Sequence, residues 1–295
     1  MEAVTQETGV GRQSASKVLA GILKQYPGKL SITGGLVLAE NGLELLYPVI
    51  AGVALDAVLE GNLSTAFIMM GIIFTFWLVG ALRRAVDTRV YTHIYKELAG
   101  KVILSERRQG LSPNSTIVHA GLARQFVDFF EIQVPAFVTA IISVAGAVIM
   151  LVILEPLIGV LAAGALLFSV LSGFRFMRKS QRFAEWLHDQ KENEPLIVTK
   201  GTPLMIARHF HVVGGRRIQL SDLEAKAYLG IGLIAAMLFG ALFIHMGTKS
   251  GVTAGHLFML INYVWTFVEN LDKMPEQLQQ IGKLRELGTR INPES

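Results

Sequence analysis

Acidic residues interrupt the first long apolar segment of the sequence. Glu40, Glu44 and Tyr47 are spaced at i, i+4 and i+7, so a helix would place them on one face. A carboxylate inside a bilayer costs about 2.5–3.5 kcal/mol on insertion scales, so it needs a cavity, a charged partner or a proton. These three residues are therefore candidates for binding substrate or protons. The alternative is that the acids pair with Arg or Lys on a neighbouring helix.

The last long apolar segment repeats this pattern. Only about a dozen apolar residues precede Glu269, fewer than the roughly twenty that a spanning helix needs, and Asn262 shares its helical arc. At helical rise, Glu44 lies about 18 Å from Asp56, and Glu269 lies about 20 Å from His256. We therefore hypothesise that Glu44 and Glu269 line a shared central cavity and bind protons near neutral pH.

The remaining polar residues of chemical interest favour simpler interpretations. Arg83 and Asp87 are one helical turn apart, which is typical of a structural ion pair. Two histidines near residue 210 stand at i, i+2 and do not converge on a metal. His245 and His256 flank the last outer connection, where isolated histidines indicate no site. We find no nucleophile triad, zinc-hydrolase motif or dinucleotide loop, so we expect no enzyme, no cofactor and no metal.

The composition indicates that these residues are held by a membrane-embedded helical bundle. The chain is 52% hydrophobic and only 17% charged, with a mean hydropathy of +0.47, which excludes an ordinary soluble domain. Cysteine is absent, which excludes disulfides and thiolate metal sites. The net charge of +4 comes from cations that flank apolar runs, so it favours a membrane protein over a nucleic-acid-binding protein.

Six apolar segments have the length expected of transmembrane helices. We predict spans at Leu30–Leu59, Ser64–Leu82, Val134–Leu154, Leu157–Met177, Tyr228–Met246 and from His256 into the Leu271 region. The connections after the first, third and fifth spans are short and hold Lys249 as their only cation. These connections should face outward, and both termini should be cytoplasmic. The predicted fold is an all-α membrane protein.

The two inner connections are long and keep helical periodicity, so the spans should continue far into the cytoplasm. These connections are Arg83–Gln133 and Arg178–Ala227, and each has one break, at Gly110–Ser115 and at Lys200–Pro203. Two long helical hairpins with polar tips are therefore predicted. An amphipathic helix is expected over residues 14–26, along the inner membrane surface ahead of the first span.

The order and spacing of these elements resemble the six-helix domain of type IV ABC exporters. Leu46–Ile50 followed by Ala54–Ala57 is similar to that family's first-helix ending, and Gly251–Ile291 is similar to its sixth helix. The resemblance implies a single domain over residues 1–295, with the bundle at 30–291 following the amphipathic elbow helix. It also implies a domain-swapped homodimer that transports a solute across the bacterial cytoplasmic (inner) membrane.

The sequence departs from that family in two respects. It has no G-x-x-x-x-G-K-[ST] motif, so we do not expect it to bind or hydrolyse ATP itself. The hairpin tips also differ from those that dock on ATPase domains; the candidate docking residues are Ser112, Pro113, Asn114, Gly201 and Thr202. The SbmA/BacA peptide transporters, which the chain also resembles, work as dimers without ATPase domains and use the proton gradient.

These features predict a transporter without its own ATPase that moves a peptide or another small amphipathic solute and is driven by protons. Two alternatives remain open. The chain is a half-transporter subunit served by a separate ATPase chain, or it is a non-transporting membrane scaffold or regulatory subunit. The partners expected from the sequence are the lipid bilayer, a second copy and the solute, with no nucleic acid.

Overall fold

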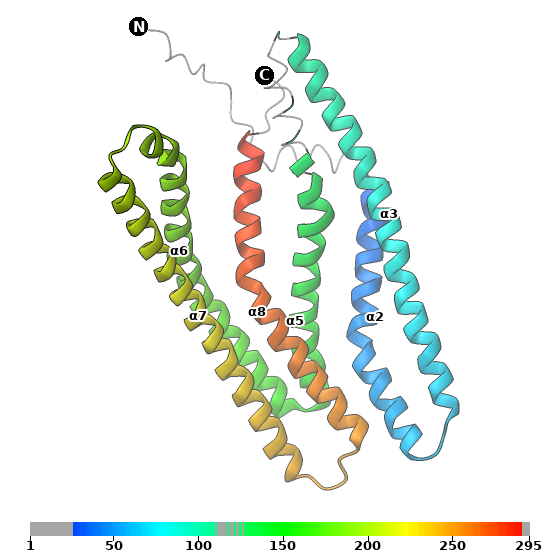
Figure 1. Ribbon diagram of the computed structural model, residues 1–295. Coiled ribbons are helices and arrows are strands. Elements are labelled where there is room, and N and C mark those ends of the chain that lie inside the picture. The colour runs from blue at the N-terminus through cyan, green and yellow to red at the C-terminus, as the bar shows by residue number, and fades with distance from the viewer. Residues whose placement is uncertain are drawn as a thin grey trace. The chain divides into compact units, whose positions relative to one another are not determined.

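The computed structural model describes residues 26–108, 110, 117, 121, 124–125 and 127–290, and every regular element in these ranges is helical. The predicted all-α fold is confirmed. The elements are α2 (Pro27–Leu59), α3 (Ser64–Arg108), the π-helical turn η1 (Phe129–Gln133), α5 (Val134–Leu154), α6 (Pro156–Lys200), α7 (Pro203–Gly247) and α8 (Ala254–Arg290) (Figure 1). The predicted amphipathic helix over 14–26 lies outside the described residues, apart from Tyr26.

Tight turns connect consecutive helices where the sequence places Gly, Asn and Pro. Gly61, between α2 and α3, and Gly251, between α7 and α8, have positive φ angles of 85° and 78°, which glycine adopts without strain. Between α5 and α6 a single residue, Glu155, is non-helical, and Pro156 begins α6. A Cβ at Gly159 would come within 2.4 Å of the Val152 backbone, so this corner requires glycine.

Five of the described helices are long and apolar enough to cross a membrane: α2, the first part of α3, α5 with η1, the first part of α6, and α7. They correspond to the first five predicted spans. The sixth predicted span forms the helix α8, but His256, Asn262 and Glu269 dilute its apolar content below that of the others. That α8 crosses the membrane therefore stays a prediction.

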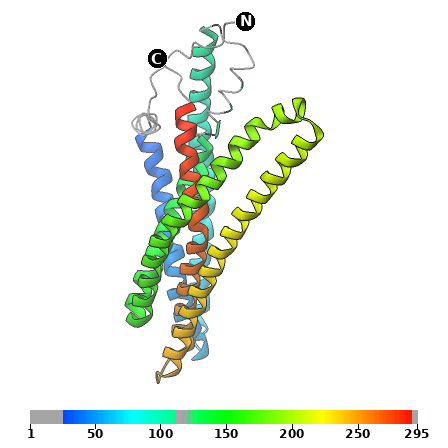
Figure 2. The ribbon, with the colours of Figure 1, turned by 90° about the vertical axis from the view of Figure 1, so that its left-hand side faces the viewer.

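Three helices are far longer than a bilayer requires. α3, α6 and α7 each have 45 residues, more than twice the roughly twenty needed to cross. The predicted break at Lys200–Pro203 is confirmed, because α6 and α7 converge on a tip at Gly201 and Thr202 (Figure 2). Of the other predicted tip, only Gly110 is described, and it has a positive φ of 71°.

The chain divides into two compact units. The first comprises the described residues of Met1–Leu46, Phe67–Ile141 and Gln280–Ser295, and the second comprises Tyr47–Ala66 and Ile142–Gln279. The core of the first unit is a cluster on α3 and the segment before η1: Val90, Tyr91, Ile94 and Val127, with Leu30 of α2 packed against it.

The second unit has its core around α8. Tyr263, Val264 and Phe267 are almost fully buried, as are residues of α5, α6 and α7: Leu151, Ile158 and Leu242. Because α8 buries its apolar face against protein, it needs fewer apolar residues on its remaining faces than a lipid-facing helix does. This packing explains its lower hydropathy.

Candidate functional site

An ion-pair network joins α2 to α3 in the first unit. The Arg83 guanidinium contacts the Glu40 carboxylate through Nε, and its Nη1 lies 3.5 Å from Asp87 Oδ2. Gly80 makes room for this contact, since a Cβ there would be 3.1 Å from Glu40 Oε1. Glu40 therefore has a cationic partner on a neighbouring helix. Such pairing is the alternative to a role in binding substrate or protons.

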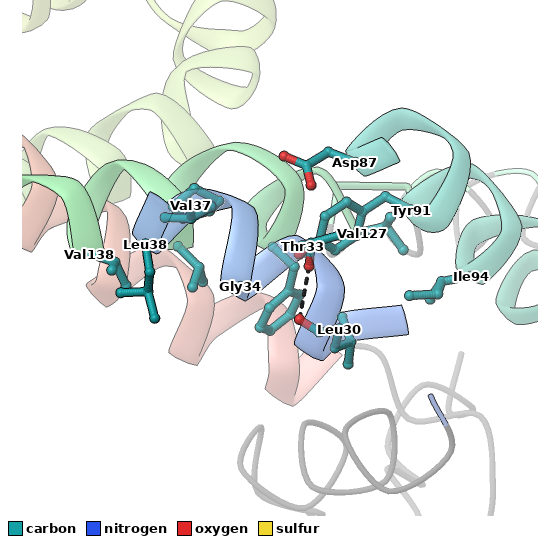
Figure 3. Close-up of a pocket in the computed structure, with 13 residues that line it drawn as sticks. Leu30, Thr33, Gly34, Val37, Leu38, Asp87, Tyr91, Ile94, Val127 and Val138 are labelled. Carbon is teal, nitrogen blue, oxygen red and sulfur yellow. Dashed lines mark hydrogen bonds between the residues drawn. The ribbon is translucent and has the colours of Figure 1, made fainter. Parts of the chain in front are cut away.

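A cavity of about 430 Å³, the Asp87 cavity, lies between α2, α3 and the start of α5 (Figure 3). Its lining is almost wholly apolar, with Leu30 and Val37 from α2 and Val138 from α5. Asp87 and Tyr91 line it from α3, where their i, i+4 spacing places them on one helix face. Its size and lining are typical of pockets for small ligands.

Asp87 is the acidic group of this cavity, and it is incompletely satisfied. The residue is only 5% exposed. Its Oδ2 faces Arg83, which Glu40 shares, but Oδ1 is buried and has no hydrogen-bond partner among the described residues. A buried acceptor without a donor costs about 1–3 kcal/mol. Asp87 therefore has an unfilled bonding position and belongs to the wall of an apolar cavity.

A buried polar contact fixes α2 against α5 beside this cavity. The Asn41 side chain donates from Nδ2 to the Val37 carbonyl at 2.7 Å and to Thr139 Oγ1 at 3.0 Å. Asn41 is only 4% exposed, so these hydrogen bonds act in a low-dielectric environment. The start of α2 is held as well, because the Tyr26 hydroxyl donates to the Glu97 carboxylate on α3. These contacts hold α2 against both α5 and α3, the other helices that form the cavity.

The second unit holds a different buried acid, in what we call the Glu155 cluster: Glu155, His245, Lys249 and His256. Lys249 Nζ donates to both carboxylate oxygens of Glu155, at 2.8 and 2.7 Å. His256 Nε2 lies 3.0 Å from Oε1, and His245 Nε2 lies 3.2 Å from Oε2. Burial raises the pKa of Glu155, but hydrogen bonds from Lys249, His256 and His245 lower it more, so the net direction is downward.

A close approach of α2 and α8 lies in the same unit. A Cβ on Gly255 would come within 2.0 Å of the Gly52 carbonyl oxygen, so the backbones touch. Asp56 fixes this contact, since its carboxylate accepts from the Gly255 amide at 2.7 Å and from the Thr253 hydroxyl at 2.6 Å. The family-like ending of the first helix is therefore the part that anchors the start of α8.

The predicted substrate or proton residues lie as follows. Glu44 and Tyr47 are exposed on α2. Asn262 donates to the Phe258 carbonyl of its own helix at 2.8 Å. The Glu269 side chain is half exposed and pairs with Lys273 one turn later at 2.7 Å. Because Glu44 and Glu269 belong to different units, the shared cavity stays a prediction.

The hairpin-tip candidates are only partly described. Gly201 must be glycine, because a Cβ there would lie 2.3 Å from the Ile197 carbonyl oxygen. Thr202 caps α7, with its hydroxyl 3.4 Å from the Met205 amide that donates to it. Leu204, at 79% exposed, follows on the same tip. Ser112, Pro113 and Asn114 lie outside the described residues.

Sequence reasoning missed the two buried acids, Asp87 and Glu155. The predicted pair of Asp87 with Arg83 is confirmed, but the burial of Asp87 is not predicted, and Glu155 is only part of a short connection in the sequence. A signal existed for Glu155: it is the lone acid between two apolar spans, and His245, Lys249 and His256 all lie around the connection between α7 and α8. Within the described ranges, no group of three or more His, Asp or Glu side chains is arranged to hold a metal ion.

The comparisons with known proteins identify the family. A comparison with curated proteins finds no match. The family model described as "ABC transporter transmembrane region" matches residues 19–255, which cover most of the chain, including all of α2, α3, α5, α6 and α7. The chain is therefore a membrane protein that belongs to the ABC transporter transmembrane region family.

Proposed function

We propose that this chain is the membrane subunit of a transporter that moves a peptide or another small amphipathic solute. The observation that carries the proposal is the Asp87 cavity, which combines an apolar lining with one incompletely bonded carboxylate. An amphipathic solute needs both kinds of surface. The family membership and the five apolar helices support the same proposal.

We further propose that the chain works as a homodimer in the bacterial inner membrane. The resemblance to exporters implies that two six-helix chains together enclose the path of the solute. Large apolar side chains cover the outer faces of the helices, as lipid or a second chain requires; examples are Phe67, Phe74, Trp77 and Phe168. The distribution of cations favours cytoplasmic termini.

The proposed driving force is the proton gradient, acting through Glu44 and Glu269. Each is an acid within a predicted span, and intramembrane acids are typical of proton pathways. Glu40, Tyr47 and Asn262 would line the same path. When Glu269 releases its proton, the ammonium group of Lys273 balances the negative charge through the salt bridge between the two side chains.

The test is solute uptake into proteoliposomes under an imposed pH gradient, with a labelled amphipathic peptide. Glu44→Gln and Glu269→Gln should each reduce gradient-driven uptake at least tenfold, while Glu60→Gln, on the exposed α2–α3 turn, should not. Unchanged uptake in both core variants would overturn proton coupling. No uptake by the wild-type chain alone would favour a scaffold or a subunit that needs a partner.

A separate ATPase subunit is the second candidate source of energy, favoured by the family and by the α6–α7 tip. The tip is a defined corner beyond the apolar part of α6, and it exposes Leu204 and Met205 next to Gly201 and Thr202. Such exposed apolar side chains can bury against a partner. If an ATPase chain copurifies with the wild type, Leu204→Glu should abolish its recovery; recovery unaffected by this change would exclude docking at the tip.

A further inference from the structure

We propose that the Asp87 cavity binds a small amphipathic cation, with its apolar body in the cavity and its protonated amine on Asp87. This proposal names the class of solute for the proposed function, and it rests on that function only in taking the bound cation to be the transported solute. Binding itself is a property of the cavity and can be tested without transport.

The apolar part of the ligand is specified by the walls. Leu30, Val37 and Leu38 of α2 and Val134 and Val138 of α5 all line the cavity of about 430 Å³. A phenyl or alkyl group of several carbons fits that volume and replaces water against these side chains. Gly34 lies within this lining, and a Cβ added to it would meet no atom within 4 Å. A larger side chain therefore has room at this exposed position of the lining.

The polar part of the ligand is specified by Asp87. Asp87 lines the cavity (Figure 3), and its Oδ1 is buried and has no hydrogen-bond partner among the residues described by the structure. Arg83 cannot fully neutralise it, because the same guanidinium contacts Glu40 directly and lies 3.5 Å from Asp87 Oδ2. A protonated amine would donate to Oδ1 as a charge-assisted hydrogen bond.

The surrounding charges favour a cation over an anion. Glu40 and Glu131 are the other carboxylates whose charges act on Asp87. Glu131 shares Arg124 with Asp128, at 4.0 and 2.8 Å respectively. Among the described residues, this network has four acids, Asp87, Glu40, Glu131 and Asp128, and two arginines, Arg83 and Arg124, so it has a net negative charge. A carboxylate ligand would be repelled, and a neutral one would leave Asp87 uncompensated.

The binding test uses the full chain in phosphatidylcholine nanodiscs and three isosteric probes: phenylbutylamine, phenylbutanol and phenylbutyrate. Empty nanodiscs give the background for partition into lipid. We expect saturable binding of the amine, at least tenfold weaker binding of the alcohol and no saturable binding of the carboxylate. Equal affinity for amine and alcohol would overturn the proposal.

Two pairs of variants assign this binding to the cavity. Asp87→Asn should weaken amine binding at least tenfold and leave alcohol binding unchanged, whereas the exposed Asp222→Asn on α7 should change neither. Gly34→Leu should abolish binding of both probes by filling the cavity. Gly35→Leu is its matched control, because Gly35 also has open space around it but does not line the cavity. Wild-type affinity in Asp87→Asn or in Gly34→Leu would contradict the proposed site.

An ammonium group could also come from a lipid headgroup, and the nanodisc composition separates the two sources. Phosphatidylethanolamine has a primary ammonium that phosphatidylcholine lacks. A soluble amine as the ligand predicts the same phenylbutylamine affinity with and without phosphatidylethanolamine; loss of binding in its presence would assign the site to the lipid instead. Amine binding without solute uptake would support this site and refute the proposed function. Solute uptake without amine binding would support the proposed function and refute this site.

Discussion

Two buried carboxylates, Asp87 and Glu155, have the same exposure of 5% and opposite surroundings. Glu155 accepts hydrogen bonds on both oxygens from Lys249, His245 and His256, at 2.7 to 3.2 Å. Asp87 has only a shared arginine at 3.5 Å on one oxygen and no donor on the other within the described part of the chain. Two glycines of the same two units differ in packing: a Cβ on Gly255 would clash with neighbouring atoms, whereas a Cβ on Gly34 would meet no atom within 4 Å.

This difference separates structural acids from ligand-binding ones. A fully bonded carboxylate has no bonding position left for a ligand, so its contribution is to hold elements together. The Glu155 cluster ties the α5–α6 corner to the end of α7 and the start of α8. A carboxylate with an unfilled position adds little to stability and can add much to binding. Four substitutions test this difference by their effect on the stability of the folded protein: Gly255→Leu, Gly34→Leu, Glu155→Gln and Asp87→Asn.

The largest effect is expected at the glycine contact of the second unit. Gly255→Leu would force a side chain into the Gly52 carbonyl and the Asp56 carboxylate, costing about 3 kcal/mol or more. Gly34→Leu should change stability by less than about 1 kcal/mol, because it enters open space. Apparent Tm in detergent measures both. Equal losses in the two variants would mean that the contrast in packing is wrong.

Glu155→Gln should have the next largest effect. The amide cannot accept from Lys249 and both histidines as the carboxylate does, so we expect a loss of about 1–3 kcal/mol, moderated by the partial exposure of Lys249. Glu60→Gln, on the exposed turn between α2 and α3, is the control. Chemical unfolding of the two variants provides the comparison, and a loss no greater than that of the control would show that the cluster holds nothing together.

The stabilisation by Glu155 should depend on pH in one direction. Its pKa is below the ordinary value of 4.5, so its contribution is fully present above that value and is lost as the pH falls through the lowered value. The difference in Tm between the wild type and Glu155→Gln should therefore persist down to about pH 4.5 and shrink below it; a difference that shrinks between pH 7 and 5 would contradict this assignment.

Asp87→Asn should have the smallest effect on stability. Arg83 keeps its contact with Glu40, and Oδ1 has no bond to lose, so we expect a change within about 1 kcal/mol in either direction. The ratio of folded to unfolded protein in denaturant measures it. A loss as large as that of Glu155→Gln would show that Asp87 is structural too.

The sequence predicted the elements of the fold because their signals are local. The predicted span Val134–Leu154 coincides with α5, since apolar length and the flanking Glu155–Pro156 turn are both properties of neighbouring residues. The Glu155 cluster depended instead on which helices pack together, because His245 lies 90 positions away in the chain. The burial of Asp87 was hidden for the same reason. The local pair with Arg83 was visible, but the α2 and α5 walls of its cavity were not.

The most direct test of the contrast is the thermal shift caused by phenylbutylamine in three proteins: the wild type, Asp87→Asn and Glu155→Gln. A ligand that binds only the folded state stabilises it by RT ln(1 + L/Kd), where L is the ligand concentration, so the apparent Tm rises once L exceeds Kd. We expect the increase to begin at the same amine concentration in the wild type and in Glu155→Gln, which starts from a lower Tm, and to need at least tenfold more amine in Asp87→Asn. An equal increase in Asp87→Asn, or an increase that is lost in Glu155→Gln, would contradict the assignment of binding to one acid and of structure to the other.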